Sequence, residues 1–175
     1  MYSKGLSEEE EHQFIALASK LDARMTAELY NAIALKFATI AVEAVTLRIK
    51  DKVVEVLLAK RSENDVHYAG QWHSPGSILR AEDAPDEIDA IGDFGKAFKR
   101  IEVENGCRFK SIQFIDWLFH RVVRGPVLAM VFTCEIDGEP ENGRFFPIDN
   151  LPEPFIEHHR PIISRAVAHY RQTKI

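Results

Sequence analysis

The sequence lacks the signatures of several large enzyme classes and of membrane-spanning proteins. It contains no Gly-x-Ser-x-Gly nucleophile elbow, no phosphate-binding Walker loop and no glycine fingerprint for a dinucleotide. A transmembrane helix needs roughly 20 apolar residues in a row. The richest stretch, residues 32–45, is interrupted by Lys36 and Glu43 and therefore belongs to a buried core. These absences argue against the corresponding classes.

Cysteine is scarce, and the chain carries no excess of positive charge. Cys107 and Cys134 are the only cysteines, and their separation matches neither a metal knuckle nor a secreted disulfide framework. The formal net charge of -5 gives no general attraction to nucleic acid or to an anionic membrane. We therefore expect a cytoplasmic protein with two reduced thiols. Its partner should be a small molecule or a protein, with no nucleic acid and no membrane.

The length of 175 residues suits one domain with an extension. Ser7 and Glu10 have the spacing of a helix capping box, and apolar residues then recur at helical spacing up to Ile33. The pattern predicts a helical extension over residues 1–38, as one helix or as two with a break near Asp22. Its apolar stripe packs either on the domain formed by residues 39–175 or on a second copy in a homodimer.

The remaining pattern changes between strand and helix without regular alternation. Short β-rich runs on either side of the turn at residues 50–52 predict a hairpin, and residues 62–77 predict a long surface connection. Asp93 is a candidate cap for a short helix that stops at Gly106. Further strands are expected at 109–123, 127–136 and 144–148, and a final helix at 161–172. This order favours an α+β fold with a mixed sheet, in which we expect Trp117 to pack in the core.

Three segments together resemble the Nudix hydrolase family. Residues 54–61 lead to Trp72, Pro75 and Gly76, which resemble the strand and turn that enter the Nudix box. A short helix ends at residues 104–107, and residues 144–152 resemble the aromatic strand and leucine-proline segment near the family's C-terminus. The resemblance covers nearly three-quarters of the chain, from about Ile40 to His169. It implies the Nudix α/β/α sandwich with a mixed sheet, preceded by the helical extension.

The catalytic signature of the family departs strongly from its usual form. Gly76 and Glu82 match its opening, but the helix that should follow is displaced by about nine inserted residues rich in Asp and Glu. With Gly106 fixing the register, Arg100 and Val103 stand where the family has glutamates, and Glu104 is the one helix carboxylate that remains. Carboxylates three and four residues apart share a helix face and can gather Mg²⁺ against a diphosphate. Neither Arg100 nor Val103 can do so.

Several side chains have two open interpretations. Arg100 either pairs with Glu104 on the helix surface or places its guanidinium where a cation would lie. The acidic insertion, with Asp83, Asp86, Glu87, Asp89 and Asp93, either folds over the helix to complete a metal site or forms a solvated loop. Three histidines are candidates for acid–base work, His67, His73 and His120, and His73 is the best candidate for the pocket. We expect His158 and His159 to form a surface pair.

The resemblance implies two functions. One is an atypical hydrolase of a nucleoside diphosphate linked to another group, with Glu104 and Glu82 as catalytic and metal-binding residues and Mg²⁺ or Mn²⁺ as the cofactor. The other is an inactive Nudix-like module that binds a nucleotide-like ligand or a protein. The residues expected to contact the phosphorylated ligand are Arg100, His73, Trp72 and Arg61. Substrate identity depends on loop geometry that the sequence does not give.

Overall fold

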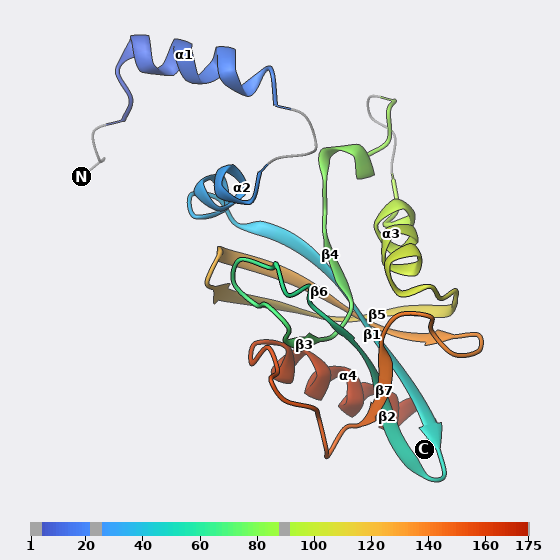
Figure 1. Cartoon of the computed structure of the whole chain (residues 1–175). Coiled ribbons are helices and arrows are strands. Elements are labelled where there is room, and N and C mark those ends of the chain that lie inside the picture. Colours follow the sequence, from blue (N-terminus) through green and yellow to red (C-terminus); the bar gives the residue numbers. More distant parts are fainter. Residues whose placement is uncertain (1–4, 22–25, 88–91, 175) are drawn as a thin grey trace.

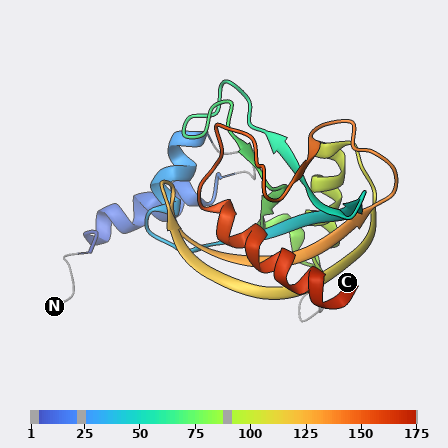
Figure 2. The same cartoon turned by 90° about the horizontal axis from the view of Figure 1, so that it is seen from below.

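The computed structural model describes residues 5–21, 26–87 and 92–174. A twisted seven-stranded mixed sheet occupies the centre of the molecule (Figure 1). The helices α3, Gly95–Asn105, and α4, His159–Lys174, pack against opposite faces of the sheet (Figures 1 and 2). The expected α+β architecture of the Nudix type, with helices on both faces, is confirmed.

The two halves of the expected hairpin are β1, Thr39–Lys50, and β2, Val53–Lys60. The turn between them places Asp51 and Lys52 at positive φ. On its other side β1 pairs in parallel with β6, Gly125–Ile136, which pairs antiparallel with the edge strand β5, Phe109–Val122. Three short strands complete the sheet: β3, Trp72–His73, and β7, Arg144–Pro147, pair with β2, and β4, Gly76–Ile78, pairs with β1.

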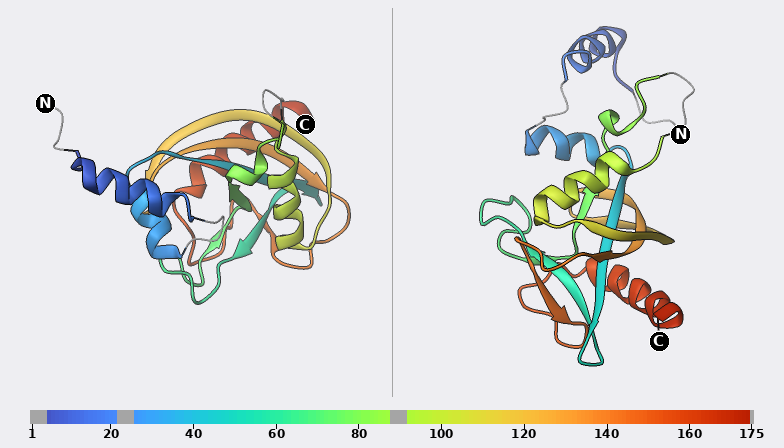
Figure 3. Two further views of the ribbon diagram at one scale, coloured as in Figure 1. Left: turned by 90° about the horizontal axis from the view of Figure 1, so that it is seen from above. Right: turned by 90° about the vertical axis from the view of Figure 1, so that its right-hand side faces the viewer.

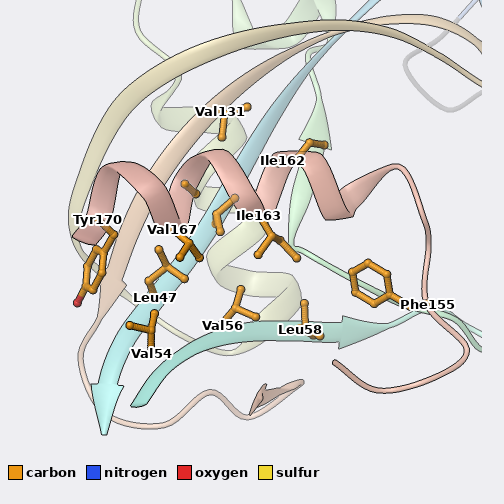
Figure 4. Packing of buried hydrophobic residues seen from close by; sticks show 12 residues of the cluster. Leu47, Val54, Val56, Leu58, Val131, Phe155, Ile162, Ile163, Val167 and Tyr170 are labelled. Atoms are coloured by element: carbon orange, nitrogen blue, oxygen red, sulfur yellow. The ribbon is translucent and has the colours of Figure 1, made fainter. Parts of the chain in front are cut away.

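The alternation of side chains along β1 assigns its residues to two cores. Val45 and Leu47 pack with α4 in one cluster (Figure 4), while Val42 and Ala44 pack with α3 in the other. β1 is covered on both faces, which explains its almost continuous apolar sequence. The same alternation places Glu43 on the α4 side, in line with Val45 and Leu47.

The helix α3 begins and ends for local reasons that the sequence largely predicts. Gly106 stands at its end with a left-handed φ of 57°, a conformation that favours glycine. Ala97, Phe98 and Ile101 form the buried face, as expected. Asp93 accepts a hydrogen bond from the Gly95 backbone, but the N-cap residue itself is Phe94, so the helix begins slightly later than predicted.

Two helices precede the sheet: α1, Glu8–Ala18, and α2, Ala27–Ala34. The Ser7–Glu10 capping box is confirmed by hydrogen bonds in both directions. The proposed break at Asp22 lies outside the described residues. No residue of α1 is buried, and this helix projects away from the sheet (Figure 3). The prediction that its apolar stripe packs on the chain's own domain is therefore wrong for α1.

Three other expectations are corrected. Residues 62–77 do not form a wholly exposed connection, because His73, Ser74 and Pro75 are buried. Trp117 is 52% exposed rather than buried, because β5 is an edge strand and α3 packs mainly over β1 and β4. The final helix begins at His159, two residues before the expected start. Across the described ranges, no helix is both long and apolar enough to cross a membrane.

Candidate functional site

A cavity of about 720 Å³ opens between α2, the start of β1, the segment 73–81, the β5–β6 hairpin and the start of α4. This volume is in the range of pockets that hold cofactors and other small ligands. Its charged and polar lining comes from segments far apart in the sequence: Glu43, Arg61, His73, Ser74, Arg80, Glu104, His120, Arg124, His158 and His159. Of the six residues predicted to form the site, the cavity brings together Arg61, His73 and Glu104.

Glu43 is the buried carboxyl group of this cavity. It is 8% exposed, and burial raises its pKa to about 8 against the opposing effect of Arg61 and Arg124. The group is therefore mostly protonated and neutral at pH 7. The sequence reasoning missed Glu43 as a site residue. The available signal was a single carboxylate within an otherwise apolar strand, since such a residue is seldom buried without a partner or a function.

Four histidines form a continuous chain of ring contacts along one wall. The ring centroid of His159 lies 5.7 Å from that of His73 and 4.6 Å from that of His158, and His158 lies 5.6 Å from His120. His159 is 4% exposed and both His158 and His159 line the cavity, so the expected surface pair is wrong. The tertiary fold turns the start of α4 inward and buries a pair that sequence alone places in solvent.

Burial keeps these imidazoles neutral. It lowers the pKa of His73 to about 3, and Arg61 adds to the effect. It lowers the pKa of His158 to about 4, with further lowering by His120, Arg124 and Arg61. The pKa of His159 lies well below its ordinary value for the same first reason. Nδ1 of His73 lies 2.8 Å from the carbonyl oxygen of Ser74, and since a carbonyl only accepts, Nδ1 carries the proton.

Two arginines supply the positive charge of the cavity. Arg61 follows β2, and its backbone N–H donates to the Gln71 carbonyl. In the described part of the chain its buried Nε has no hydrogen-bond partner. Burial, followed by the nearby Arg124, lowers the pKa of Arg61. Arg124, from the β5–β6 turn, lies 5.8 Å above the ring of Tyr68. Two neighbouring guanidinium groups, one with an unsatisfied buried donor, form a strong anion-binding arrangement.

Arg100 is not paired with Glu104. Its guanidinium donates from Nη1 and Nη2 to the two carboxylate oxygens of Asp83, and the Nη2 distance is 2.8 Å. Ser77 Oγ and the Ile78 carbonyl accept further hydrogen bonds from Arg100 at 3.2 to 3.3 Å. The proposed Arg100–Glu104 surface pair is therefore wrong. The hydrogen bonds from Arg100 lower the pKa of Asp83 and keep it ionised.

The first residue of the acidic insertion, Asp83, has a role that neither interpretation included. Asp83 is buried against Arg100, and Lys96 of α3 donates from Nζ to the backbone carbonyls of Glu82 and Ala84. Asp86, Glu87 and Asp93 are exposed, as in the solvated-loop interpretation. Asp89 lies outside the described residues. The described start of the insertion therefore ties the preceding segment to α3.

The metal that the resemblance implies does not fit the residues present. Arg100 fills one position of the expected metal face, Val103 is 69% exposed at another, and Glu104 alone offers a carboxylate from the helix. Glu82 is half exposed and pairs with Arg80 at 3.1 Å. Within the described parts of the chain, no three His, Cys, Asp or Glu residues are grouped to hold a metal ion. The donor set lacks the oxygen ligands that Mg²⁺ requires.

Trp72 has a structural position. Its ring packs edge-on against Phe146 at a centroid distance of 5.0 Å, next to the core between the sheet and α4. Its backbone N–H donates to the Pro154 carbonyl and its carbonyl accepts from Ile156, so the residue joins β3 to the C-terminal segment. Trp72 and Glu82 are not among the residues that line the cavity.

Known structures share this fold, whereas sequence comparisons find no relative. No protein-family model matches the chain, and no curated protein sequence matches it. The NUDIX domain of Shewanella oneidensis NrtR, solved with ADP-ribose, has a TM-score of 0.60 and 20% identity over 83% of this chain and 99% of that one. The MutT NUDIX hydrolase of Burkholderia pseudomallei has a TM-score of 0.55 and 20% identity over 74% of this chain and 98% of that one.

The chain therefore has the Nudix fold. NrtR from S. oneidensis, solved in complex with a 27mer DNA, matches with a TM-score of 0.59 and 16% identity over 77% of this chain. This chain spans only 63% of the length of that NrtR chain. Identities this low establish the architecture, and function must be argued from the site.

Proposed function

We propose that this protein is a ligand-binding module of the Nudix fold that holds a nucleotide-like diphosphate, such as ADP-ribose, without cleaving it. The observation that carries the proposal is the Arg100–Asp83 ion pair. It occupies the helix face where the family resemblance calls for metal-binding carboxylates. Arg100 is thereby fixed by a protein carboxylate, and the divalent ion that would polarise a phosphoryl oxygen has no matching ligand set.

The cavity supports binding of an anion even though the metal face is lost. Arg61 and Arg124 lie near each other at the cavity wall, and no described residue accepts a hydrogen bond from the buried Nε of Arg61. Guanidinium groups match phosphate oxygens in geometry and charge, and such contacts are stronger where water is excluded. A diphosphate would relieve the repulsion between the two cations. This arrangement gives the ligand an anchoring site that needs no metal.

The fold comparison supports the same ligand class. The NUDIX domain of NrtR was solved with ADP-ribose, and this chain matches nearly the whole of that domain. The MutT match keeps hydrolysis as the second candidate. The feature that favours hydrolysis here is Glu104, a carboxylate that lines the cavity at the family's position.

Calorimetric titration of ADP-ribose, ADP and AMP, in EDTA and in Mg²⁺ or Mn²⁺, separates these candidates. Product release is followed in parallel by chromatography. We expect binding that is the same with and without metal, and no product. Arg61→Gln should weaken diphosphate binding by roughly tenfold or more, because charged hydrogen bonds are lost. The control is Arg171→Gln, since Arg171 is exposed on α4 and lies outside the cavity.

Two outcomes would contradict the proposal. Metal-dependent turnover that Glu104→Gln abolishes would establish the hydrolase. The absence of binding to any of the three nucleotides, in EDTA or in metal, would exclude a nucleotide-like ligand.

A further inference from the structure

Besides Arg61 Nε, three buried polar atoms of cavity-lining residues have no hydrogen-bond partner among the described residues: Glu43 Oε2, Ser74 Oγ and His159 Nδ1. We call these three residues the floor of the cavity. They are 8%, 0% and 4% exposed, respectively. Glu43 Oε2 and His159 Nδ1 are 3.7 Å apart, beyond hydrogen-bond distance. All three residues line the same cavity. Unsatisfied buried polar groups are uncommon and costly, and three of them here belong to residues that line one cavity.

The floor is neutral although it is polar. Burial raises the pKa of Glu43 to about 8 and holds the pKa of His159 well below its ordinary value. A protonated carboxyl both donates and accepts hydrogen bonds, as do a serine hydroxyl and a neutral imidazole. The positive charge lies instead at Arg61 and Arg124. The cavity thus combines a cationic wall with an uncharged floor of mixed donors and acceptors.

We propose that the floor formed by Glu43, Ser74 and His159 binds the hydroxyl groups of a sugar, the pentose joined to the diphosphate held at Arg61 and Arg124. This assignment rests on the proposed function, and it names the part of the ligand that gives specificity. A sugar hydroxyl is itself both donor and acceptor, and several adjacent hydroxyls match three polar groups that line one cavity. The phosphate side of the ligand then remains with the arginines.

Other groups complement this floor less well. A phosphate at the floor would bring its charge into a buried region whose nearest groups are neutral, while the two guanidinium groups would be left unpaired. A cation would require Glu43 to ionise and would be repelled by Arg61 and Arg124, both of which act on Glu43. A sugar is uncharged, so it satisfies the three atoms without either cost.

The test compares ADP-ribose with ADP, because the two share the adenosine diphosphate and differ by the terminal ribose. Dissociation constants are measured by calorimetry for the natural protein, Ser74→Ala and Glu43→Gln. We expect the natural protein to prefer ADP-ribose by at least about tenfold. Ser74→Ala should reduce that preference roughly three- to tenfold while leaving the affinity for ADP unchanged.

Glu43→Gln provides the second variant, since an amide keeps a donor and an acceptor in a neutral group of similar shape. The preference for ADP-ribose should largely persist in that protein, whereas Glu43→Leu should reduce it. Circular dichroism shows whether each variant is folded. If Glu43→Leu does not fold, Ser74→Ala alone decides the test. Equal affinity for the two nucleotides, or a preference that Ser74→Ala leaves intact, would overturn the sugar site alone. Failure of both nucleotides to bind would overturn the proposed function with it.

Discussion

Arg100 donates two hydrogen bonds to the two carboxylate oxygens of Asp83, seventeen positions earlier in the chain. The pair joins α3 to the single turn of 3-10 helix η1, Ala81–Asp83, at the edge of the cavity. Asp83 also accepts a hydrogen bond from the Arg80 backbone, so its position is fixed on both sides. The pair connects the start of the insertion with the helix position that the family uses for metal.

Removing the Asp83 carboxylate should destabilise the fold. Asp83 is 8% exposed, and its loss would leave the Arg100 guanidinium without its counter-ion. We expect Asp83→Ala to lower the free energy of unfolding by about 2–4 kcal/mol, as for other buried pairs that lose one partner. Urea unfolding followed by circular dichroism measures the change. Asp86→Ala is the matched control, because Asp86 is exposed, and it should change stability by less than about 0.5 kcal/mol.

Restoring the helix carboxylates should restore metal binding. The triple variant Asp83→Ala, Arg100→Glu, Val103→Glu removes the ion pair and places two glutamates at i and i+3, with Glu104 adjacent. We expect it to bind Mn²⁺ at least roughly tenfold more tightly than the natural protein in calorimetric titration. The comparison protein carries Asp83→Ala with Arg100→Gln and Val103→Gln, so that it lacks the two new carboxylates. Equally tight Mn²⁺ binding by the natural protein would show that its own residues do hold a metal.

The stability of the protein should depend on the protonation of Glu43. Its pKa is raised from 4.5 to about 8 by burial, so the folded state holds a proton that the unfolded state releases. The stabilisation is full below pH 4.5 and is lost as the pH rises towards 8, at ~1.4 kcal/mol for each unit of pKa difference. Glu43→Gln removes this dependence, so the variant should gain stability relative to the natural protein over that range.

The measurement is the difference in unfolding free energy between the two proteins at pH 4.5, 6 and 8. His73 and His158 have lowered pKa values, so their contributions are lost as the pH falls below 6.5. Both proteins carry these histidines, and their effects largely cancel in the difference. A difference that is flat across the range would mean that Glu43 is ionised in the folded protein.

Deleting residues 1–18 should leave the domain as stable as before. No residue of α1 is buried, whereas Phe14, Ile15 and Leu17 are each more than half exposed. We expect a change in unfolding free energy of less than about 0.5 kcal/mol. Light scattering on both proteins then tests the possible homodimer. An exposed apolar helix of this length is only marginally stable alone. A dimer that becomes monomeric on deletion would therefore support α1 as the interface. An oligomeric state that is the same in both proteins would exclude it.

Most of the fold could be predicted because local patterns and the family resemblance agreed. The hairpin of β1 and β2, the stop of α3 at Gly106 and the long strands β5 and β6 all lie close to their expected positions. Trp117 was wrongly placed, because its β-rich sequence does not tell whether a helix covers that face of the edge strand.

The site was less predictable than the fold. Three of the predicted site residues, Arg61, His73 and Glu104, line the cavity, and their roles stay predictions. Four further lining residues were not assigned to the site: Glu43, Arg124, His158 and His159. Glu43 left a signal, a carboxylate in an apolar strand. The sequence contains no comparable signal for Arg124, His158 or His159. These residues reach the cavity only when the β5–β6 hairpin and the start of α4 pack beside β1.

The sequence by itself determined that α3 offers Glu104 alone where the family resemblance calls for three carboxylates, since residue types at fixed helical spacing decide which oxygen ligands a helix can offer. It also determined the order of strands and helices, which follows from local periodicity. Only the tertiary structure decided that Arg100 pairs with Asp83 rather than Glu104 and that Glu43 faces His159 in a cavity. These relationships depend on distances between segments far apart in the chain, and the same packing sets the burial that keeps Glu43 and the histidines neutral.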